Sequence, residues 1–192
     1  PGYTNTAATR PQNITIKNSV FTSQVVIDYL QNGNILFDNN THNNIDTNST
    51  CTATPARFHF PYDQNVQTGV TIQNSVFSGG NTDGIQTGGG VTIIGNIFIN
   101  IHEKSSSDCA HTDPIQLFGN GHVVRGNYIT DSADGIVAYD RVGNSLIENN
   151  VVDLKSGRYG IELYSDNGST VRNNTLVYNA SCASESCGQI VL

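Results

Sequence analysis

Val70-Thr71-Ile72-Gln73-Asn74-Ser75-Val76-Phe77 is a segment that recurs, with variation, along the whole chain of 192 residues. It consists of a short apolar strand, a small polar corner and a second apolar strand. Further copies begin at Ile14, Ile35, Val91, Val123, Leu146 and Val171. One such unit cannot bury its apolar face alone, whereas stacked units bury a continuous core. The sequence therefore predicts a solenoid, whose functional surfaces are built by stacked coils.

The spacing of the corners indicates which kind of solenoid this is. The second residues of the corner pairs are Ser19, Asn40, Ser75, Asn96, Asn127, Asn150 and Asn174, at steps of 21, 35, 21, 31, 23 and 24 residues. A base coil of about 21–24 residues, with insertions near 41–57 and 101–112, explains these steps. Short β-rich runs between Asn, Gly, Ser and Asp favour three brief strands per turn. We therefore expect an all-β, right-handed, single-stranded parallel β-helix of about eight coils, in one domain over 1–192.

The corner asparagines Asn96, Asn127, Asn150 and Asn174 have a structural interpretation. We expect them to stack as a ladder in a tight turn, where they adopt left-handed backbone geometry and satisfy backbone groups. They are not predicted to bind a ligand.

A second column of similar segments falls between the corners. Its members are Asp83-Gly84-Ile85-Gln86, Asp113-Pro114-Ile115-Gln116, Asp134-Gly135-Ile136-Val137 and Tyr159-Gly160-Ile161-Glu162. Because side chains alternate across a strand, the four isoleucines are expected to point into the core. The residues that follow them, Gln86, Gln116, Val137 and Glu162, are then expected to point outward.

Charge and composition limit the possible partners. The chain has 16 Asp and Glu against nine Lys and Arg, for a net charge of −7. This acidity argues against nucleic acid or an anionic membrane surface as the main partner. No apolar stretch approaches the length of a membrane span, and we expect no signal peptide among these residues. The chain begins at Pro1 without Met and ends within a strand motif, so we expect an excised or processed piece that lacks one or both end caps.

The four cysteines favour a secreted protein. Cys182 and Cys187 bracket a short loop and are candidates for a local disulfide, and Cys51 and Cys109 each lie in one of the two inserted loops. Four cysteines allow three pairings, and four free thiols in a cytosolic protein are the alternative. The absence of Met and Trp and the many Asn, Thr and Ser also suit an extracellular location.

Asp83, Asp113 and Asp134 are the first candidates for catalysis. In the expected register they stand on consecutive coils, with neighbours ~5 Å and the outer pair ~10 Å apart. Glycosidases that retain the anomeric configuration use two carboxylates about 5–5.5 Å apart, and those that invert it use two carboxylates ~6.5–9.5 Å apart. The alternative is that an Asp before Gly or Pro is a turn residue that caps backbone N–H groups.

Residues near this column extend the candidate site. His111 lies two residues before Asp113 and would form an acid–base pair with it. Substrate-binding candidates are Gln86, Gln116, Tyr139, Arg141 and His102, the last in a loop over 101–110 that is expected to overhang the strand.

Cofactor chemistry receives little support from the sequence. His42, His59 and His122 have no partner pattern and are interpreted as surface or corner residues. No paired Cys/His spacing indicates zinc. No cofactor is required, although calcium at the Asp83, Asp113 and Asp134 column is compatible with the sequence.

The corner and strand motifs resemble those of the right-handed parallel β-helix proteins of the pectate-lyase-like superfamily, over nearly the whole chain. The resemblance implies an extracellular enzyme that acts on acidic polysaccharides in a groove along one sheet, or a tailspike or adhesin. Asn81-Thr82-Asp83-Gly84 is also similar to the first catalytic motif of the polygalacturonases, where that Asp is one of three acids. The chain departs from that family afterwards, with Asp113-Pro114 instead of an Asp-Asp pair, and without Gly-His-Gly or Arg-Ile-Lys.

Two functions follow as hypotheses. The first is a secreted polysaccharide hydrolase or lyase that works along the face marked by the three aspartates. The second is a structural or adhesive β-helix, such as a filament subunit or tailspike segment, whose exposed sheet edges pair end to end.

Overall fold

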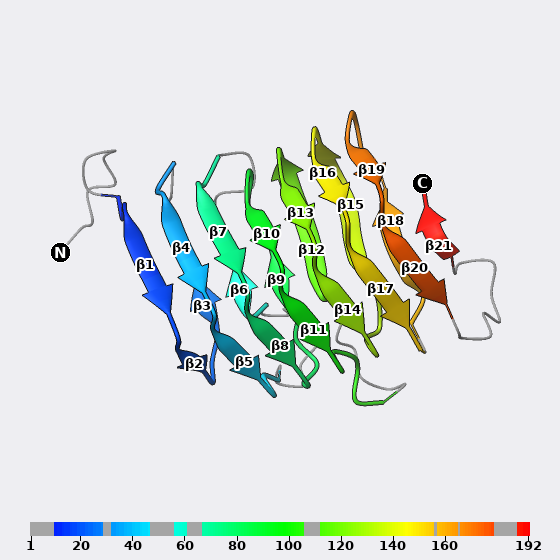
Figure 1. Ribbon diagram of the computed structural model, residues 1–192, viewed down its shortest axis with the longest axis horizontal. Helices are drawn as coiled ribbons and strands as arrows, with labels where there is room; N and C mark the ends of the chain where they lie inside the picture. The colour runs from blue at the N-terminus through cyan, green and yellow to red at the C-terminus, as the bar shows by residue number, and fades with distance from the viewer. Residues whose placement is uncertain are drawn as a thin grey trace.

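The structure is a computed structural model that describes residues 10–28, 32–46, 56–60, 67–105, 112–155, 157–164, 166–178 and 188–192, and not the side chains of 139–141. Every regular element in these ranges is a β-strand, and the strands form three parallel sheets of seven strands each. Figure 1 shows the coils side by side along the long axis of the molecule. None of the described residues forms a helix that could cross a membrane.

Sheet A contains the strand that precedes each polar corner. Its strands, in spatial order, are β1 (Ile14–Lys17), β4 (Ile35–Asp38), β7 (Val70–Gln73), β10 (Thr92–Ile94), β13 (Val123–Arg125), β16 (Leu146–Glu148) and β19 (Thr170–Arg172).

Sheet B contains the strand that follows the corner. Its strands are β2 (Val20–Phe21), β5 (Thr41–Asn43), β8 (Val76–Ser78), β11 (Ile97–Ile99), β14 (Tyr128–Thr130), β17 (Val151–Leu154) and β20 (Thr175–Tyr178).

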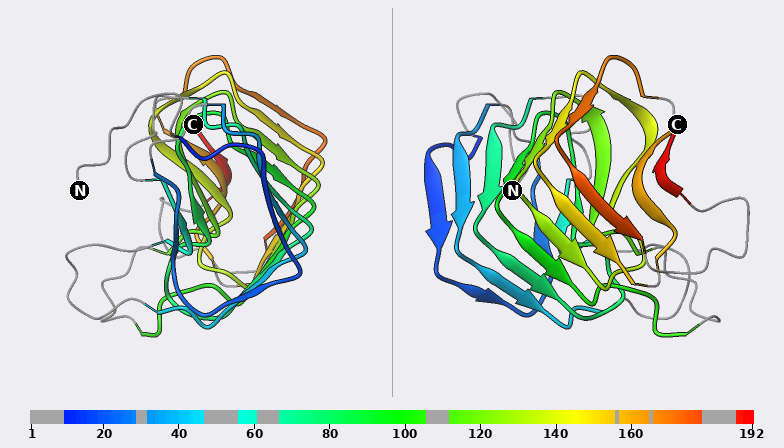
Figure 2. Two further views of the ribbon diagram at one scale, coloured as in Figure 1. Left: turned by 90° about the vertical axis from the view of Figure 1, so that its left-hand side faces the viewer. Right: turned by 45° about the vertical axis from the view of Figure 1, so that its right-hand side comes forward.

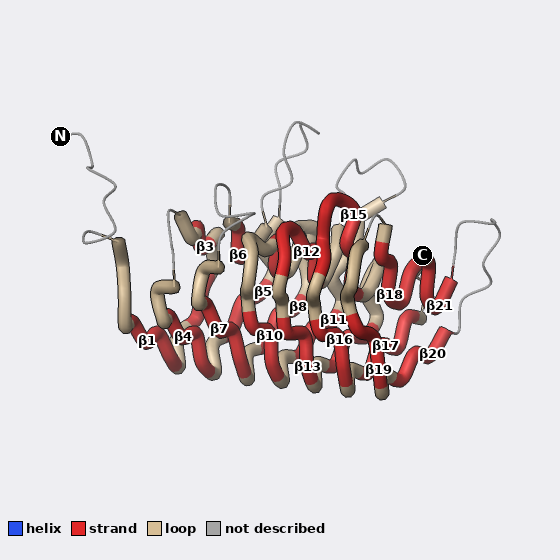
Figure 3. The backbone as a smooth tube through the Cα atoms, turned by 90° about the horizontal axis from the view of Figure 1, so that it is seen from above, coloured by secondary structure: helices blue, strands red, loops and turns tan. Residues whose placement is uncertain are grey.

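Sheet C closes each coil. Its strands are β3 (Val25–Val26), β6 (Phe58–His59), β9 (Ile85–Gln86), β12 (Ile115–Asn120), β15 (Ile136–Gly143), β18 (Tyr159–Leu163) and β21 (Gly188–Val191). The chain passes from sheet A to B to C and back to A, so that each strand pairs with its equivalents in the neighbouring coils. Viewed along the long axis the coils superimpose, and viewed from above they follow one another in a row (Figures 2 and 3). The predicted parallel β-helix is therefore confirmed, while the count of about eight coils stays a prediction.

The core follows the predicted inward column. Ile85, Ile115, Ile136 and Ile161 pair in register across sheet C and have no exposed surface. Sheets A and B contribute equivalent ladders, and these side chains form one continuous apolar cluster. Burying each such side chain stabilises the fold by about 1.5–3 kcal/mol, so the core can hold the coils without helices.

The corners explain the abundance of Asn and Gly. Every described residue with a positive φ is Asn, Asp or Gly, the residues that tolerate this conformation best. At the A-to-B corner they are Asn18, Asn39, Asn74, Gly95, Gly126, Asn149 and Asn173. The left-handed residue is thus the one before each of Asn96, Asn127, Asn150 and Asn174, which corrects the expectation that the latter adopt this geometry.

The buried corner ladder performs the backbone role that was expected of it. The side-chain oxygen of Asn127 accepts the backbone N–H of Asn96 at 3.0 Å, and its amide donates to the carbonyl of Ile93 at 3.0 Å. Asn150 and Asn174 repeat the first contact in the next two coils. These bonds fasten each coil to the next where no strand pairing exists.

His42 is a core residue, so its interpretation as a surface or corner residue is wrong. The imidazole has no exposed surface and stacks between Phe21 and Phe77, with ring centroids 4.7 and 4.6 Å away. Phe98 continues the stack beyond Phe77. Burial lowers the pKa of His42 to about 3, so the ring is neutral inside this aromatic ladder.

Candidate functional site

The three predicted catalytic aspartates lie in register at the start of the sheet C strands. Each precedes the paired ladder residues Ile85, Ile115 and Ile136 by two positions. They therefore form a column along the axis, which we call the acidic column (Asp83, Asp113 and Asp134). Its members are, however, at most 1% exposed.

The carboxylates of Asp83 and Asp134 bind backbone groups of the following coil. Oδ1 of Asp83 accepts the N–H of Asp113 at 2.9 Å. Oδ1 of Asp134 accepts the N–H of Tyr159 at 3.0 Å, and its Oδ2 accepts a charged hydrogen bond from Arg158 at 2.9 Å. Through these contacts the two aspartates cap backbone N–H groups, which is the structural alternative to catalysis that the sequence left open.

Asp134 has the most perturbed acidity in the column. Burial, and then the charge of Asp113, raise the pKa of Asp134 to about 7, although Arg158 and the N–H of Tyr159 lower it. A carboxyl group that holds a proton near neutral pH is suited to general acid catalysis. Here both of its oxygens face protein donors and none of its surface is exposed, so the arrangement favours a structural role.

The remaining residues of the Asn81-Thr82-Asp83-Gly84 motif also have structural contacts. The hydroxyl of Thr82 donates to the carbonyl of Ile45 at 2.8 Å and accepts a bond from Arg57 at 3.3 Å. A side chain at Gly84 would lie 2.3 Å from the carbonyl oxygen of Pro114, so only glycine fits there. The resemblance to a catalytic motif is thus accounted for by the packing of successive coils.

The outward row of sheet C is mostly covered. Gln86 and Gln116 pair in register, and Nε2 of Gln86 donates to Oε1 of Gln116 at 2.7 Å. Gln116 is only 8% exposed, and Val137 and Glu162, the next members of the row, are buried. The two amides therefore satisfy each other, and their predicted contact with sugar hydroxyls stays untested.

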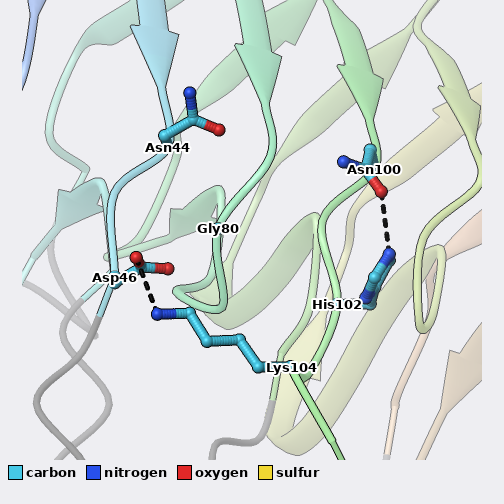
Figure 4. A pocket seen from close by; sticks show the side chains of 6 residues that line it. All are labelled: Asn44, Asp46, Gly80, Asn100, His102 and Lys104. Atoms are coloured by element: carbon cyan, nitrogen blue, oxygen red, sulfur yellow. Dashed lines mark hydrogen bonds and ion pairs between the residues drawn. The ribbon is translucent and has the colours of Figure 1, made fainter.

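An open hollow lies beside the acidic column, where sheet B turns into sheet C. It has a volume of about 320 Å³ and is lined by Asn44, Asp46, Gly80, Asn100, His102 and Lys104, and we call it the corner pocket. These residues follow the strands β5, β8 and β11, so three consecutive coils form the pocket. Figure 4 shows Asp46 directed at Lys104 and Asn100 directed at His102.

Two glycines let the middle coil pack closely against its neighbour at the pocket. Asn44, Gly79 and Asn100 directly follow the sheet B strands of the three coils, and all have a positive φ. A side chain at Gly79 would lie 2.2 Å from Oδ1 of Asn44, and one at Gly80 would lie 2.4 Å from the carbonyl oxygen of Ile45. The middle coil therefore presents only backbone, while the coils on either side present polar side chains.

The pocket walls are held by specific contacts. Nζ of Lys104 lies 2.8 Å from Oδ2 of Asp46, and Oδ1 of Asp46 accepts the N–H of Asn81 at 3.2 Å. The ring nitrogens of His102 contact Oδ1 of Asn100 at 2.8 Å and the carbonyl of Glu103 at 3.0 Å. The turn that carries Gly79 is fixed by buried Arg57, which donates to the carbonyls of Ser78 and Gly79.

The predicted site residues are thus only partly brought together. His102 lines the corner pocket, whereas Gln86 and Gln116 lie on sheet C. His111 and the cysteines Cys51, Cys109, Cys182 and Cys187 lie outside the described residues, as do the side chains of Tyr139 and Arg141. Their proposed roles stay predictions.

Sequence reasoning missed Asn44, Asp46 and Asn100 as site residues, and it named Lys104 only as part of the loop over 101–110. The signal that reveals them is the Gly79-Gly80 pair directly after a strand. When the corners are aligned, Gly79 falls at the level of Asn44 and Asn100. The pair therefore marks a corner at which the middle coil has no side chains.

No metal centre is visible in the part of the chain that the structure describes. It contains no group of three or more His, Cys, Asp or Glu side chains arranged to hold an ion. Calcium at the acidic column stays a prediction.

Comparison with known families agrees with this architecture. The model of the family described as "Right handed beta helix region" matches residues 44–190. The chain therefore belongs to the right-handed β-helix family, which is compatible with a carbohydrate-active or a structural protein. Comparison with curated proteins and with solved structures finds no match.

Proposed function

We propose that this protein binds a polysaccharide and holds one sugar unit in the corner pocket. The observation that carries the proposal is the pocket, which is open and lined by two amides, an imidazole, a carboxylate, an ammonium group and a glycine. These side chains supply both donors and acceptors, as sugar hydroxyls require. None of the described lining residues has an apolar side chain, so the pocket is poorly suited to a hydrophobic ligand.

The rigidity of the pocket supports binding. Its residues belong to corners that strand pairing and the buried Arg57 hold in place. A site that is already formed loses little conformational entropy when a ligand binds. A polysaccharide also suits a solenoid, because successive sugar units can contact successive coils. The proposal includes an extracellular location, which the composition and cysteines favour.

Binding is tested with a panel of plant, algal and bacterial glycans, followed by calorimetry on those that bind. Asn100→Gly removes an amide from the pocket and keeps the left-handed backbone conformation. Asn149→Gly is the matched control, because Asn149 is exposed with φ 57° at the opposite corner. We expect Asn100→Gly and His102→Ala to weaken binding about tenfold each, and Asn149→Gly to bind normally. Equal effects of Asn100→Gly and Asn149→Gly would refute the site.

Cleavage of the bound chain is the further part of the sequence prediction, with Asp113 and His111 as the acid–base pair and Asp83 and Asp134 as partner carboxylates. Release of reducing ends, or ultraviolet absorbance of unsaturated products, detects a hydrolase or a lyase. Activity that persists in the Asp83→Asn, Asp113→Asn double variant would exclude this assignment.

Self-association is the second candidate function, and the outer face of sheet B favours it. Ile97, Ile99, Tyr128 and Val151 are exposed there, and Ile97, Tyr128 and Val151 pair in register. On a chain with a net charge of −7, this apolar strip is where a second copy can approach with least repulsion. Sedimentation of the protein and of Ile97→Lys tests this role. A wild-type monomer at all concentrations would rule it out.

A further inference from the structure

The corner pocket carries charges of both signs that cancel. Among the described residues that line the pocket, the one carboxylate, Asp46, forms an ion pair with the one ammonium group, Lys104, at 2.8 Å. The two side chains are 39% and 57% exposed, so they lie at the open side of the pocket. A ligand therefore meets a paired carboxylate and ammonium group.

The other cationic groups near this corner are also engaged. Arg57 is fully buried and donates to backbone carbonyls, and Arg158 is paired with Asp134. Both ring nitrogens of His102 already contact oxygen atoms. A ligand carboxylate that accepted a hydrogen bond from Lys104 would therefore lie beside the carboxylate of Asp46, and the two negative charges would repel each other.

We infer that the corner pocket selects a neutral sugar unit and discriminates against a uronate. This inference rests on the proposed polysaccharide-binding function. A hydroxyl group both donates and accepts, so it can bond to Asp46 and Lys104 without separating them. A uronate brings a second negative charge beside Asp46, on a chain whose net charge is already −7. The substrate class is therefore a neutral glycan, in contrast to the acidic polysaccharides that the family resemblance implied.

Matched oligosaccharides test the inference on the intact chain. Neutral glucan, mannan and galactan oligosaccharides are compared by calorimetry with the same oligosaccharides oxidised at C6 to uronates. We expect the neutral form of at least one pair to bind more tightly, by about fivefold or more, with little dependence on salt. Tighter binding of the oxidised forms would overturn the inference and leave the proposed function intact. Binding of neither form would overturn the proposed function.

Asp46→Asn provides a test by gain of function. The asparagine oxygen still accepts the N–H of Asn81, so the corner keeps its backbone contact. The ion pair between Lys104 and Asp46 is lost, and the net charge of the pocket rises by one. We expect affinity for the oxidised oligosaccharides to increase about threefold to fivefold, and affinity for the neutral ones to change little. Lys104→Met is the opposite variant and should weaken binding of the oxidised forms further. If neither variant changes the ratio of the two affinities, charge in the pocket does not control selectivity and the inference fails.

Discussion

The acidic column and the corner pocket lie next to each other on the same turn of the solenoid, yet they differ in what their polar groups contact. In the column, Asp83 and Asp134 bind backbone N–H groups of the next coil and are shielded from solvent. In the pocket, Gly80 presents only backbone, and polar side chains of the coils on either side line a hollow that solvent reaches. Alignment of acidic residues on successive coils is therefore not sufficient for a site. A binding site also requires open space beside its polar side chains, as in the corner pocket.

The tight packing of the column predicts the largest effect. In Gly135→Ala the new methyl group would lie 2.1 Å from the carbonyl oxygen of Gly160 and 2.8 Å from Val152. Because backbone must move, we expect a loss of about 3 kcal/mol or more in the free energy of unfolding. Urea denaturation measures it. The control is Gly126→Ala, which meets no atom within 4 Å and has only the strain of its φ of 64°, at about 1–2 kcal/mol. Equal losses would mean that the column is not closely packed.

Replacing an aspartate of the column separates its structural role from binding. Asp83→Ala leaves the buried N–H of Asp113 without its acceptor, at a cost of about 1–3 kcal/mol of stability. Asp83→Asn keeps an acceptor oxygen and should lose less than Asp83→Ala. Chemical denaturation and glycan binding, measured on the same samples, check this. A fully stable Asp83→Ala variant would show that the carboxylate does not fasten the coils.

His42 offers a test of the interior by pH. The pKa of its ring is about 6.5 when the chain is unfolded and about 3 when it is folded. As the pH falls from 6.5 towards 3, the unfolded chain takes up a proton here and the folded chain does not, so stability is lost on acidification. His42→Phe removes this loss and extends the aromatic stack.

We therefore expect the stability advantage of His42→Phe over wild type to grow by about 1.4 kcal/mol for each pH unit below 6.5. Thermal unfolding at several pH values measures this difference. An advantage that does not depend on pH would mean that the folded ring titrates normally and is not shielded.

The pocket predicts the smallest effect on stability. Asp46 and Lys104 are both partly exposed, and such pairs contribute about 0.2–1 kcal/mol. Lys104→Met should therefore change the free energy of unfolding by less than about 1 kcal/mol while it alters sugar selectivity. A larger loss of stability would mean that the ion pair between Asp46 and Lys104 serves mainly to hold the fold together.

The sequence predicts the fold well because the repeated segments fix a register. The spacing of Ile85, Ile115 and Ile136 was sufficient to align the sheet C strands and the aspartates that precede them. It did not show that the aspartates are buried, because the alternation of side chains is lost at a corner, where a carboxylate can turn towards the next coil. His42 lies two residues after its corner, at the position that Phe21, Phe77 and Phe98 occupy in other coils. That position predicts a core residue, but the sequence interpretation relied on the polarity of histidine instead.

The pocket depends on three segments that are distant in the sequence. Asn44 and Asn100 are separated by 56 positions in the chain, and only coil stacking brings them to the two sides of Gly80. Reading each motif by itself therefore found His102 but not the residues around it.

Calorimetry with the best-binding glycan on Asn100→Gly and Asp83→Asn side by side tests the central claim most directly. The account predicts that Asn100→Gly binds about tenfold more weakly, and that Asp83→Asn binds as tightly as the wild type. Normal binding by Asn100→Gly together with lost binding by folded Asp83→Asn would contradict it and return the functional site to the aspartates.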